Sequence, residues 1–295
     1  MSDTDEVLPW RARRPRPVEA FVSRAARRAA AELGLDPSQL AGSGRSGRVT
    51  RDDVLDAGSA TERGDDVVPF NNVRKRAAGL LLASKQTSAH TLCVVRADYT
   101  AIEEVRRTAR SDWRSREGFS LTYLPFVARA AIDGLRAFPL VNSSVGGDAL
   151  VVHRAINLGI AVDLDFQGLV VPVVPGADGL RLRSLARAIN DVATRARAKK
   201  LVPDDLAGGS FTITNPGGSG TWLSFPIINQ PQVAILATDG VSKQVIADER
   251  GRLVIAPVGH LCLTFDHRAL DGAYAGAFLT YVQELVETRD WATEL

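Results

Sequence analysis

From Val67 onward the sequence alternates short apolar runs with longer amphipathic segments, and this alternation constrains the fold more than any other feature. The short runs are rich in β-branched residues, which predicts strands over 89–99, 156–163, 168–174, 210–214, 232–238 and 260–266. The longer segments have helical spacing of their apolar residues, which predicts helices over 100–110, 121–138, 182–199 and 272–288. Strands and helices mixed in this way predict an α/β fold with one open mixed sheet covered by helices.

The first part of the chain has a different composition. Residues 1–20 are rich in proline and arginine without apolar periodicity, which indicates a flexible arm. Residues 21–57 predict a small α-helical domain, whose second helix is capped by Thr50. Residues 58–66 are small and polar, which predicts a linker to the α/β domain over 67–295.

Composition excludes several classes of protein. The chain has 36 basic and 34 acidic residues, a formal net charge of +2, which argues against a general nucleic-acid binder. No apolar run approaches the ~20 residues that cross a bilayer, and the N-terminus lacks the apolar core of a secretory signal. The two cysteines, Cys93 and Cys262, cannot form a disulfide framework. We therefore expect a cytoplasmic protein without membrane contact.

The histidines do not predict a metal site. His90, His153 and His260 have no metal-ligand spacing to one another or to the cysteines. We expect them to be structural, with His90 as a candidate supporting residue of a site.

The sharpest local feature is His267, which stands four residues before Asp271, itself followed by Gly272, at the exit of a predicted strand and just before a predicted helix. Reactive side chains are often presented at such exits. The alternative is a histidine packed at a strand end, followed by an aspartate that caps the helix. The local pattern alone leaves both interpretations open.

The second feature is Thr214, at the end of the predicted strand 210–214 and before the turn Asn-Pro-Gly-Gly. Such a turn leaves backbone N–H groups and a hydroxyl free to stabilise an oxyanion. The alternative is a plain strand exit, which the pattern by itself favours.

Together these stretches resemble the dihydrolipoamide acyltransferases, the E2 components of 2-oxo acid dehydrogenase complexes. The resemblance covers most of residues 21–290. Its motifs stand in the family's order and at its spacing: FPLVNSSV, NLGIAVD, GLVVPVV, FTITNPGGSGT, PIINQPQVAIL and FDHRALDGAYAGAFL. Residues 21–57 resemble the family's peripheral subunit-binding domain, through ARRAAAELGLD and GSGRSGRVTRDDV. The resemblance implies a chloramphenicol acetyltransferase-like fold for 67–295.

The family's chemistry moves an acyl group between the thiols of coenzyme A and dihydrolipoamide. The resemblance implies that His267 is the general base for the attacking thiol, a role that suits a side chain with a pKa near neutrality. It implies that Thr214 donates to the tetrahedral oxyanion and that Asp271 organises the site. Asn142 and Ser144 fall where the family lines its coenzyme A channel.

The resemblance also implies partners. The family's catalytic domain is a homotrimer with its active site between subunits, so His267 would face Thr214 of a neighbour. Arg27, Arg28 and Arg48 match positions that dock the E1 or E3 dehydrogenase subunits. Coenzyme A enters as a substrate, and no metal is implied.

Departures from the family lead to three further expectations. No lysine precedes Lys75, so we expect no lipoyl attachment site in this chain and a lipoyl domain or another acyl carrier acting in trans. Residues 287–295 lack the family's leucine-rich tail, which predicts isolated trimers. Ala31 stands where the family has an arginine, which predicts weaker docking.

Two alternatives remain open at this point. One is a non-catalytic E2-like scaffold that docks partner subunits. The other is an acyltransferase acting on an acyl-carrier protein or a small-molecule acceptor. The intact His267, Asp271 and Thr214 favour an enzyme, and the docking domain argues against a small-molecule acceptor. The sequence does not name the acyl group.

Overall fold

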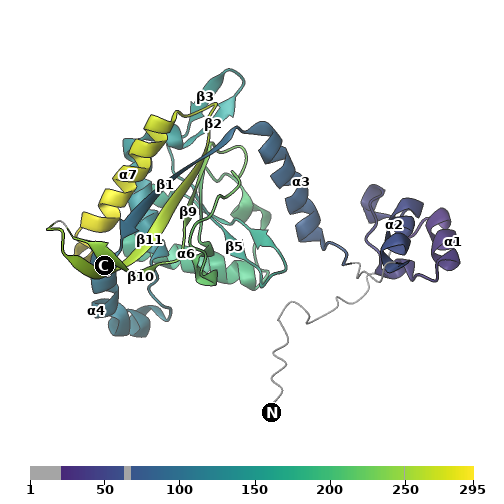
Figure 1. Cartoon of the computed structure of the whole chain (residues 1–295), viewed down its shortest axis with the longest axis horizontal. Coiled ribbons are helices and arrows are strands. Elements are labelled where there is room, and N and C mark those ends of the chain that lie inside the picture. The colour runs from purple at the N-terminus through teal and green to yellow at the C-terminus, as the bar shows by residue number, and fades with distance from the viewer. Residues whose placement is uncertain (1–20, 63–67, 249) are drawn as a thin grey trace, which may run out of the picture. The chain divides into compact units, whose positions relative to one another are not determined.

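The computed structural model describes residues 21–62, 68–248 and 250–295, and the chain divides into two compact units after Lys75 (Figure 1). The expected arm over 1–20 lies outside the described residues. No helix in the described part of the chain is long and apolar enough to span a membrane.

The small unit is built on two helices, α1 (Arg24–Glu32) and α2 (Arg51–Glu62), with short 3-10 turns η2 (Pro37–Gln39) and η3 (Arg45–Gly47) between them. Ser23 starts α1 by accepting a hydrogen bond from the N–H of Ala26 at 3.1 Å. Thr50 starts α2, because its hydroxyl accepts from the N–H of Asp53, whose carboxylate accepts from the N–H of Thr50. The core is small and made of alanine and valine side chains: Ala26, Ala29, Ala30, Val49 and Val54.

The structure corrects the expected linker over 58–66. The helix α2 continues through Glu62, so the first part of that segment is helical, and residues 63–67 lie outside the described residues. Gly58 is a packing position, since a Cβ there would lie 2.6 Å from Cδ1 of Leu33. The local sequence does not distinguish a glycine that lets two helices pack closely from a glycine in a linker.

The larger unit is built on a seven-stranded mixed sheet in the order β1-β11-β9-β8-β4-β7, with β10 paired to β11. The strand β8 runs parallel to β4 and β9, and the other pairs are antiparallel. The strands are β1 (His90–Asp98), β4 (Leu158–Ile160), β7 (Val173–Val174), β8 (Phe211–Thr214), β9 (Ala234–Thr238), β10 (Ser242–Ala247) and β11 (Leu253–Asp266). Two small hairpins pair β2 (Ser143–Gly146) with β3 (Ala149–Val152) and β5 (Val162–Asp163) with β6 (Leu169–Val170).

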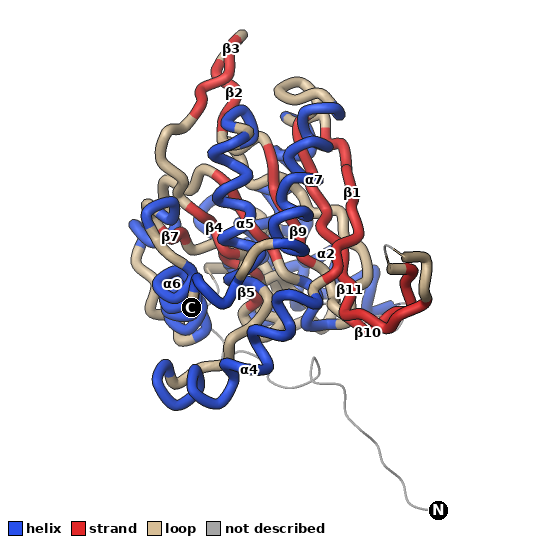
Figure 2. Tube along the Cα trace, turned by 90° about the vertical axis from the view of Figure 1, so that its left-hand side faces the viewer, coloured by secondary structure: helices blue, strands red, loops and turns tan. Residues whose placement is uncertain are grey.

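Helices cover the sheet, which confirms the predicted α/β class. The covering helices are α4 (Thr100–Glu117), α5 (Leu124–Ala137), α6 (Leu182–Arg197) and α7 (Gly272–Thr288). The helix α3 (Asn72–Thr87) precedes β1 and is mostly exposed. The 3-10 helices are η4 (Pro139–Val141), η5 (Ala177–Gly179), η6 (Pro203–Leu206), η7 (Pro216–Ser219) and η8 (Trp291–Glu294). Figure 2 shows α5 and α7 side by side across the sheet. Between them and the sheet lies the core, with Phe126, Phe211 and Phe278 fully buried.

Several elements differ from the sequence expectation. The predicted strand 156–163 is split, because Leu158–Ile160 pairs with β8 in the main sheet whereas Val162–Asp163 pairs with β6 in a separate hairpin. The strand β10 and the helix α3 were not predicted. The helix α3 has three consecutive leucines, Leu80, Leu81 and Leu82, which break helical periodicity and are all exposed.

Candidate active site

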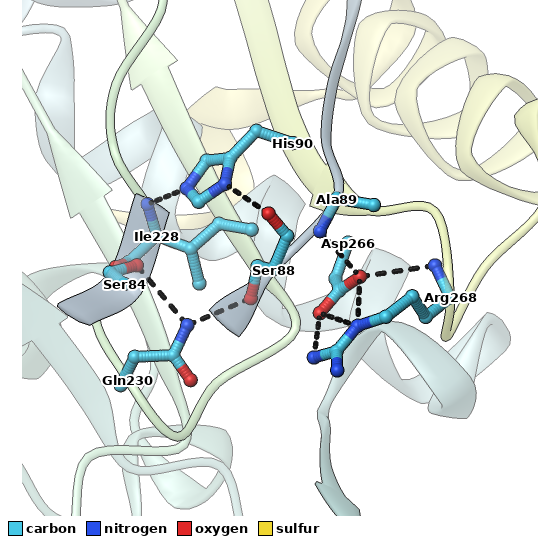
Figure 3. Close-up of polar contacts among 8 residues, drawn as sticks. All are labelled: Ser84, Ser88, Ala89, His90, Ile228, Gln230, Asp266 and Arg268. Atoms are coloured by element: carbon cyan, nitrogen blue, oxygen red, sulfur yellow. Dashed lines mark hydrogen bonds and ion pairs between the residues drawn. The ribbon is translucent and has the colours of Figure 1, made fainter. Parts of the chain in front are cut away.

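The carboxylate of Asp266 anchors the end of β11. It accepts hydrogen bonds from the N–H of Ala89 at 3.1 Å and from the N–H and guanidinium of Arg268, with Nη2 at 2.7 Å (Figure 3). The N–H of His267 in turn donates to the carbonyl of Ala89 at 2.9 Å. The backbone at His267 is therefore fixed from both sides by Ala89 and by the Asp266–Arg268 pair.

Asp266 stays ionised in this setting. Burial by itself raises the pKa of this carboxyl, but the hydrogen bonds from Arg268 and Ala89 outweigh that effect and lower the pKa to about 2. Sequence reasoning missed Asp266. The signal was a carboxylate closing an otherwise apolar strand.

The His267 side chain is exposed beyond this anchor. Its ring lies 5.5 Å from that of Phe265, and no hydrogen bond to either ring nitrogen is present among the described residues. Asp271 stands at the N-cap of α7, yet its side chain accepts no bond from the helix. Asp271 therefore caps the helix through its backbone carbonyl, which accepts from the N–H of Ala275, and not through its side chain. An exposed imidazole and an exposed carboxylate thus flank one turn.

His90 supports the neighbouring loop. The N–H of Ile228 donates to Nε2 of His90 at 3.1 Å, so Nδ1 carries the ring hydrogen and donates to the carbonyl of Ser88 at 3.0 Å. Beside it the amide of Gln230 donates to the hydroxyls of Ser84 and Ser88 (Figure 3). These contacts join the last turn of α3 to the segment before β9.

Thr214 lies half-buried at the end of β8, and its hydroxyl has no hydrogen-bond partner within the described part of the chain. Thr214 pairs with Ala237 of β9, and Ala237 pairs with Cys262 of β11, five residues before His267. The two residues are therefore offset by two strand spacings of ~4.8 Å and by five residues along the strand at ~3.3 Å each. These offsets place Thr214 and His267 roughly 19 Å apart. One chain does not bring the two residues together.

Ser144 lies at the same end of the sheet as His267. It forms an isolated bridge with Gln232, and the next residue, Val233, donates to the carbonyl of Ser143 and accepts from the N–H of Asp266. Two strand spacings of ~4.8 Å therefore separate Ser144 from the end of β11.

Asn142 is in a different position from Ser144. Its side chain is 1% exposed, and its amide nitrogen donates to the carbonyls of His153 and Ala155 at 2.9 and 3.1 Å. Within one chain the side-chain amide of Asn142 thus holds the two ends of the β2–β3 hairpin together. Its Oδ1 has no hydrogen-bond partner among the described residues.

In the small unit, the three candidate docking arginines are all exposed. Arg28 pairs with Glu32 one turn along α1 at 3.2 Å. The guanidinium of Arg48 lies 4.2 Å from the centre of the Phe21 ring, and Arg27 projects from α1. The three arginines thus place positive charge on the surface of the small unit.

Metal ligands do not cluster in the described part of the chain, where no three histidine, cysteine, aspartate or glutamate side chains are placed to share an ion. Cys93 and Cys262 are both free thiols. Burial is the main cause that raises the pKa of Cys262 to about 12.

Comparison with known families matches both units. Residues 62–293 match the model of the 2-oxoacid dehydrogenases acyltransferase catalytic domain. Residues 21–55 match the e3 binding domain.

Individual relatives agree with these matches. The chain is 32% identical over 302 residues to the lipoamide acyltransferase component of the branched-chain alpha-keto acid dehydrogenase complex of Bacillus subtilis, covering 91% of this chain and 71% of that protein. It is 34% identical to the dihydrolipoyllysine-residue succinyltransferase component of the 2-oxoglutarate dehydrogenase complex of Escherichia coli, covering 90% and 70%.

A solved structure has the same fold. The dihydrolipoamide acetyltransferase of Azotobacter vinelandii superposes with a TM-score of 0.72 at 31% identity, covering 77% of this chain and 93% of that chain. That structure was studied for the catalytic roles of a serine, a histidine and an asparagine, the last two four positions apart, as His267 and Asp271 are here. The chain therefore belongs to the acyltransferase family of 2-oxoacid dehydrogenase complexes and carries an e3 binding domain in front of its catalytic domain.

Proposed function

We propose that His267 is the general base of thioester exchange between coenzyme A and dihydrolipoamide. The imidazole removes the proton of one thiol, whose ordinary pKa of ~8.5 lies close enough for a neutral histidine to assist. The new thiolate adds to the thioester carbonyl of the other carrier. The tetrahedral intermediate then expels that carrier's thiolate, which recovers the proton from the imidazolium.

The observation that carries this role is the combination of a free ring and a fixed backbone. The His267 ring makes no hydrogen bond to the described residues, while its backbone is held by Ala89 and flanked by the Asp266 carboxylate. A general base needs an unbonded ring nitrogen to accept the proton of the substrate thiol. It also needs a fixed backbone, because catalysis depends on a pre-set position of the base.

The oxyanion donor is Thr214 of a neighbouring copy, in a homotrimer. A separation of roughly 19 Å within one chain is too large for His267 to reach the thiol and Thr214 to reach the oxyanion of one tetrahedral intermediate, which supports a site between copies. Exposed apolar side chains on α3 and on the segment after β8 provide surface for such contacts: Leu80, Leu81, Leu82, Trp222 and Phe225. Asp271, at the same turn as His267, orients the site.

Coenzyme A approaches from the His267 end of the sheet. Ser144 on β2 lines this approach, and Asn142 holds the hairpin that carries it. The other carrier is a lipoyl domain supplied in trans.

Residues 21–57 act as the docking domain for E1 or E3 dehydrogenase subunits, and residues 67–295 act as the catalytic domain. Exposed Arg27, Arg28 and Arg48 supply the charge for docking. We place the complex in the cytoplasm, which the two free thiols, Cys93 and Cys262, support.

A thioester-transfer assay tests the proposal. Purified protein is given acetyl-, succinyl- or branched acyl-coenzyme A together with a reduced lipoyl domain, and acyl-lipoyl product is measured. The proposal predicts transfer with one class of acyl group and a kcat lower by ~10²–10⁴-fold in His267→Ala. Near-native transfer by that folded variant would exclude His267 as the base, and no transfer with any carrier would favour a docking scaffold.

A further inference from the structure

The segment that follows Thr214 is held by a buried carboxylate, Asp239, at the end of β9. Asp239 is only 3% exposed. It accepts from the N–H of Ser224 at 3.1 Å and from the hydroxyl of Ser224 at 2.9 Å. It also accepts from the thiol of Cys262 on β11 at 3.2 Å. The carboxylate therefore joins the far end of the segment 215–224 to two strands of the main sheet.

The backbone around Asp239 holds the near end of the same segment. A Cβ on Gly217 would lie 2.6 Å from the carbonyl carbon of Asp239, so only glycine fits there. The N–H of Gly240 donates to the carbonyl of Thr221 at 2.8 Å. The segment from Asn215 to Ser224 is thus fixed against residues 239–240 at its start, middle and end.

The contacts around Asp239 are unusual for a buried charge. The described ion pairs include none with Asp239, and its hydrogen-bond donors are the neutral groups of Ser224 and Cys262. A buried carboxylate without a cation needs every one of these donors, so it ties them down more firmly than a neutral acceptor would.

We propose that Asp239 is a positioning residue for the oxyanion donor, acting through the segment 215–224 to set the direction of the Thr214 hydroxyl. This inference rests on the proposed role of Thr214. Thr214 is directly continuous with the held segment, and its hydroxyl has no hydrogen bond within the described part of the chain to orient it. Its direction toward a neighbouring copy therefore depends on the backbone at residues 214–217.

A positioning role makes a specific kinetic prediction. An oxyanion donor acts mainly in the transition state, so its misplacement lowers kcat while leaving KM for coenzyme A nearly unchanged. A displacement of about 1 Å costs up to ~100-fold in rate. Loss of Asp239 therefore affects kcat, and it affects kcat only while Thr214 is present to be positioned.

Cys262 gives a second readout that does not depend on activity. Its thiol is fully buried beneath the held segment, and burial is the first cause of its raised pKa. In a Cys93→Ser background Cys262 is the sole thiol of the chain. Release of the segment exposes it, so its rate of reaction with a small disulfide reagent rises by about tenfold or more.

The test is a double-mutant cycle between Asp239→Asn and Thr214→Val, with Asp248→Asn as the control. Asp248 also accepts backbone N–H bonds in a turn, those of Arg250 and Arg252, but on the β10–β11 hairpin. The proposal predicts a fall in kcat of about 10–100-fold for Asp239→Asn, faster Cys262 labelling, and little change for Asp248→Asn. In the Thr214→Val background Asp239→Asn should cause no further loss.

Each outcome decides a different point. If Thr214→Val alone leaves kcat unchanged, the proposed role of Thr214 is wrong. If Thr214→Val lowers kcat but Asp239→Asn leaves it unchanged, or lowers it to the same extent in both backgrounds, the positioning role is wrong. Should Asp239→Asn fail to fold, Ser224→Ala, which removes the hydroxyl donor alone, takes its place. The expected result is then a smaller fall in kcat that again disappears in the Thr214→Val background, and an unchanged kcat would overturn the proposal.

Discussion

Thr214 and His267 lie beside opposite ends of the strand β9, roughly 19 Å apart. Thr214 pairs with Ala237 near the end of β9, whereas His267 follows β11 past the start of β9. Both side chains are accessible at their own ends. The proposed chemistry needs the His267 ring within hydrogen-bond reach of the thiol and the Thr214 hydroxyl within hydrogen-bond reach of the oxyanion of the same tetrahedral intermediate. This separation is the reason for placing the site between two copies, and the predictions below follow from that placement.

The Thr214 hydroxyl should matter in the transition state. Replacing it in Thr214→Val keeps the side-chain shape and removes the donor. We expect kcat and kcat/KM to fall together by ~10²–10³, because the hydrogen bond to the oxyanion forms as the carbonyl becomes tetrahedral. Steady-state transfer kinetics measure this. A change confined to KM would show that Thr214 only binds substrate.

The Asp266 anchor should lose its effect in acid. Its pKa of about 2 in the folded chain lies below the ordinary carboxyl value, so its stabilisation is fully present above pH ~4 and is lost as the pH falls toward 2. Near pH 7, Asp266→Asn should lower the free energy of unfolding by up to ~2 kcal/mol, and this difference should shrink below pH ~4. Urea unfolding of both proteins across this range measures it. A difference that stays constant with pH would contradict the account of this carboxylate.

Assembly should stop at the trimer. The last described turn, η8, inserts Trp291 into its own chain, where it is 1% exposed and its ring lies 5.3 Å from that of Phe126. Because it is buried in its own chain, the Trp291 side chain is not available as a contact between trimers. Three copies of 31.7 kDa give a closed particle of about 95 kDa in light scattering. A megadalton particle would contradict this prediction, and so would a stable active monomer.

Docking through the small unit should depend on charge. Binding of an E1 or E3 subunit should weaken as salt rises, and reversing Arg27 and Arg28 to glutamate should abolish it. Transfer from coenzyme A to a free lipoyl domain should continue, since residues 67–295 carry the chemistry. Calorimetry against each dehydrogenase subunit makes the comparison. Absent binding even at low salt would mean that these arginines are only solvated.

Local patterns predicted the elements whose cause is local. The helix over 272–288 and the strand end at Thr214 match the structure, since apolar periodicity and an Asn-Pro-Gly-Gly turn are local signals. The local pattern places a carboxylate, Asp266, at the end of an apolar strand, but its contact with Ala89 could not be predicted locally because Ala89 is 177 residues away in the chain. The helix α3 was missed because its exposed leucines break the pattern of a one-sided helix. The shared site came only from the family resemblance, since no pattern within one chain encodes a neighbour.

The most direct test of the shared site is complementation between two inactive variants. Purified His267→Ala and Thr214→Val are mixed, dissociated and reassembled, and transfer is compared with that of each variant treated alone. In every mixed trimer one interface joins an intact His267 to an intact Thr214, so random mixing should restore about a quarter of the wild-type sites. Transfer that stays at the level of the separate variants, in mixtures shown by mass to contain both chains, would contradict the claim that these residues act across two copies.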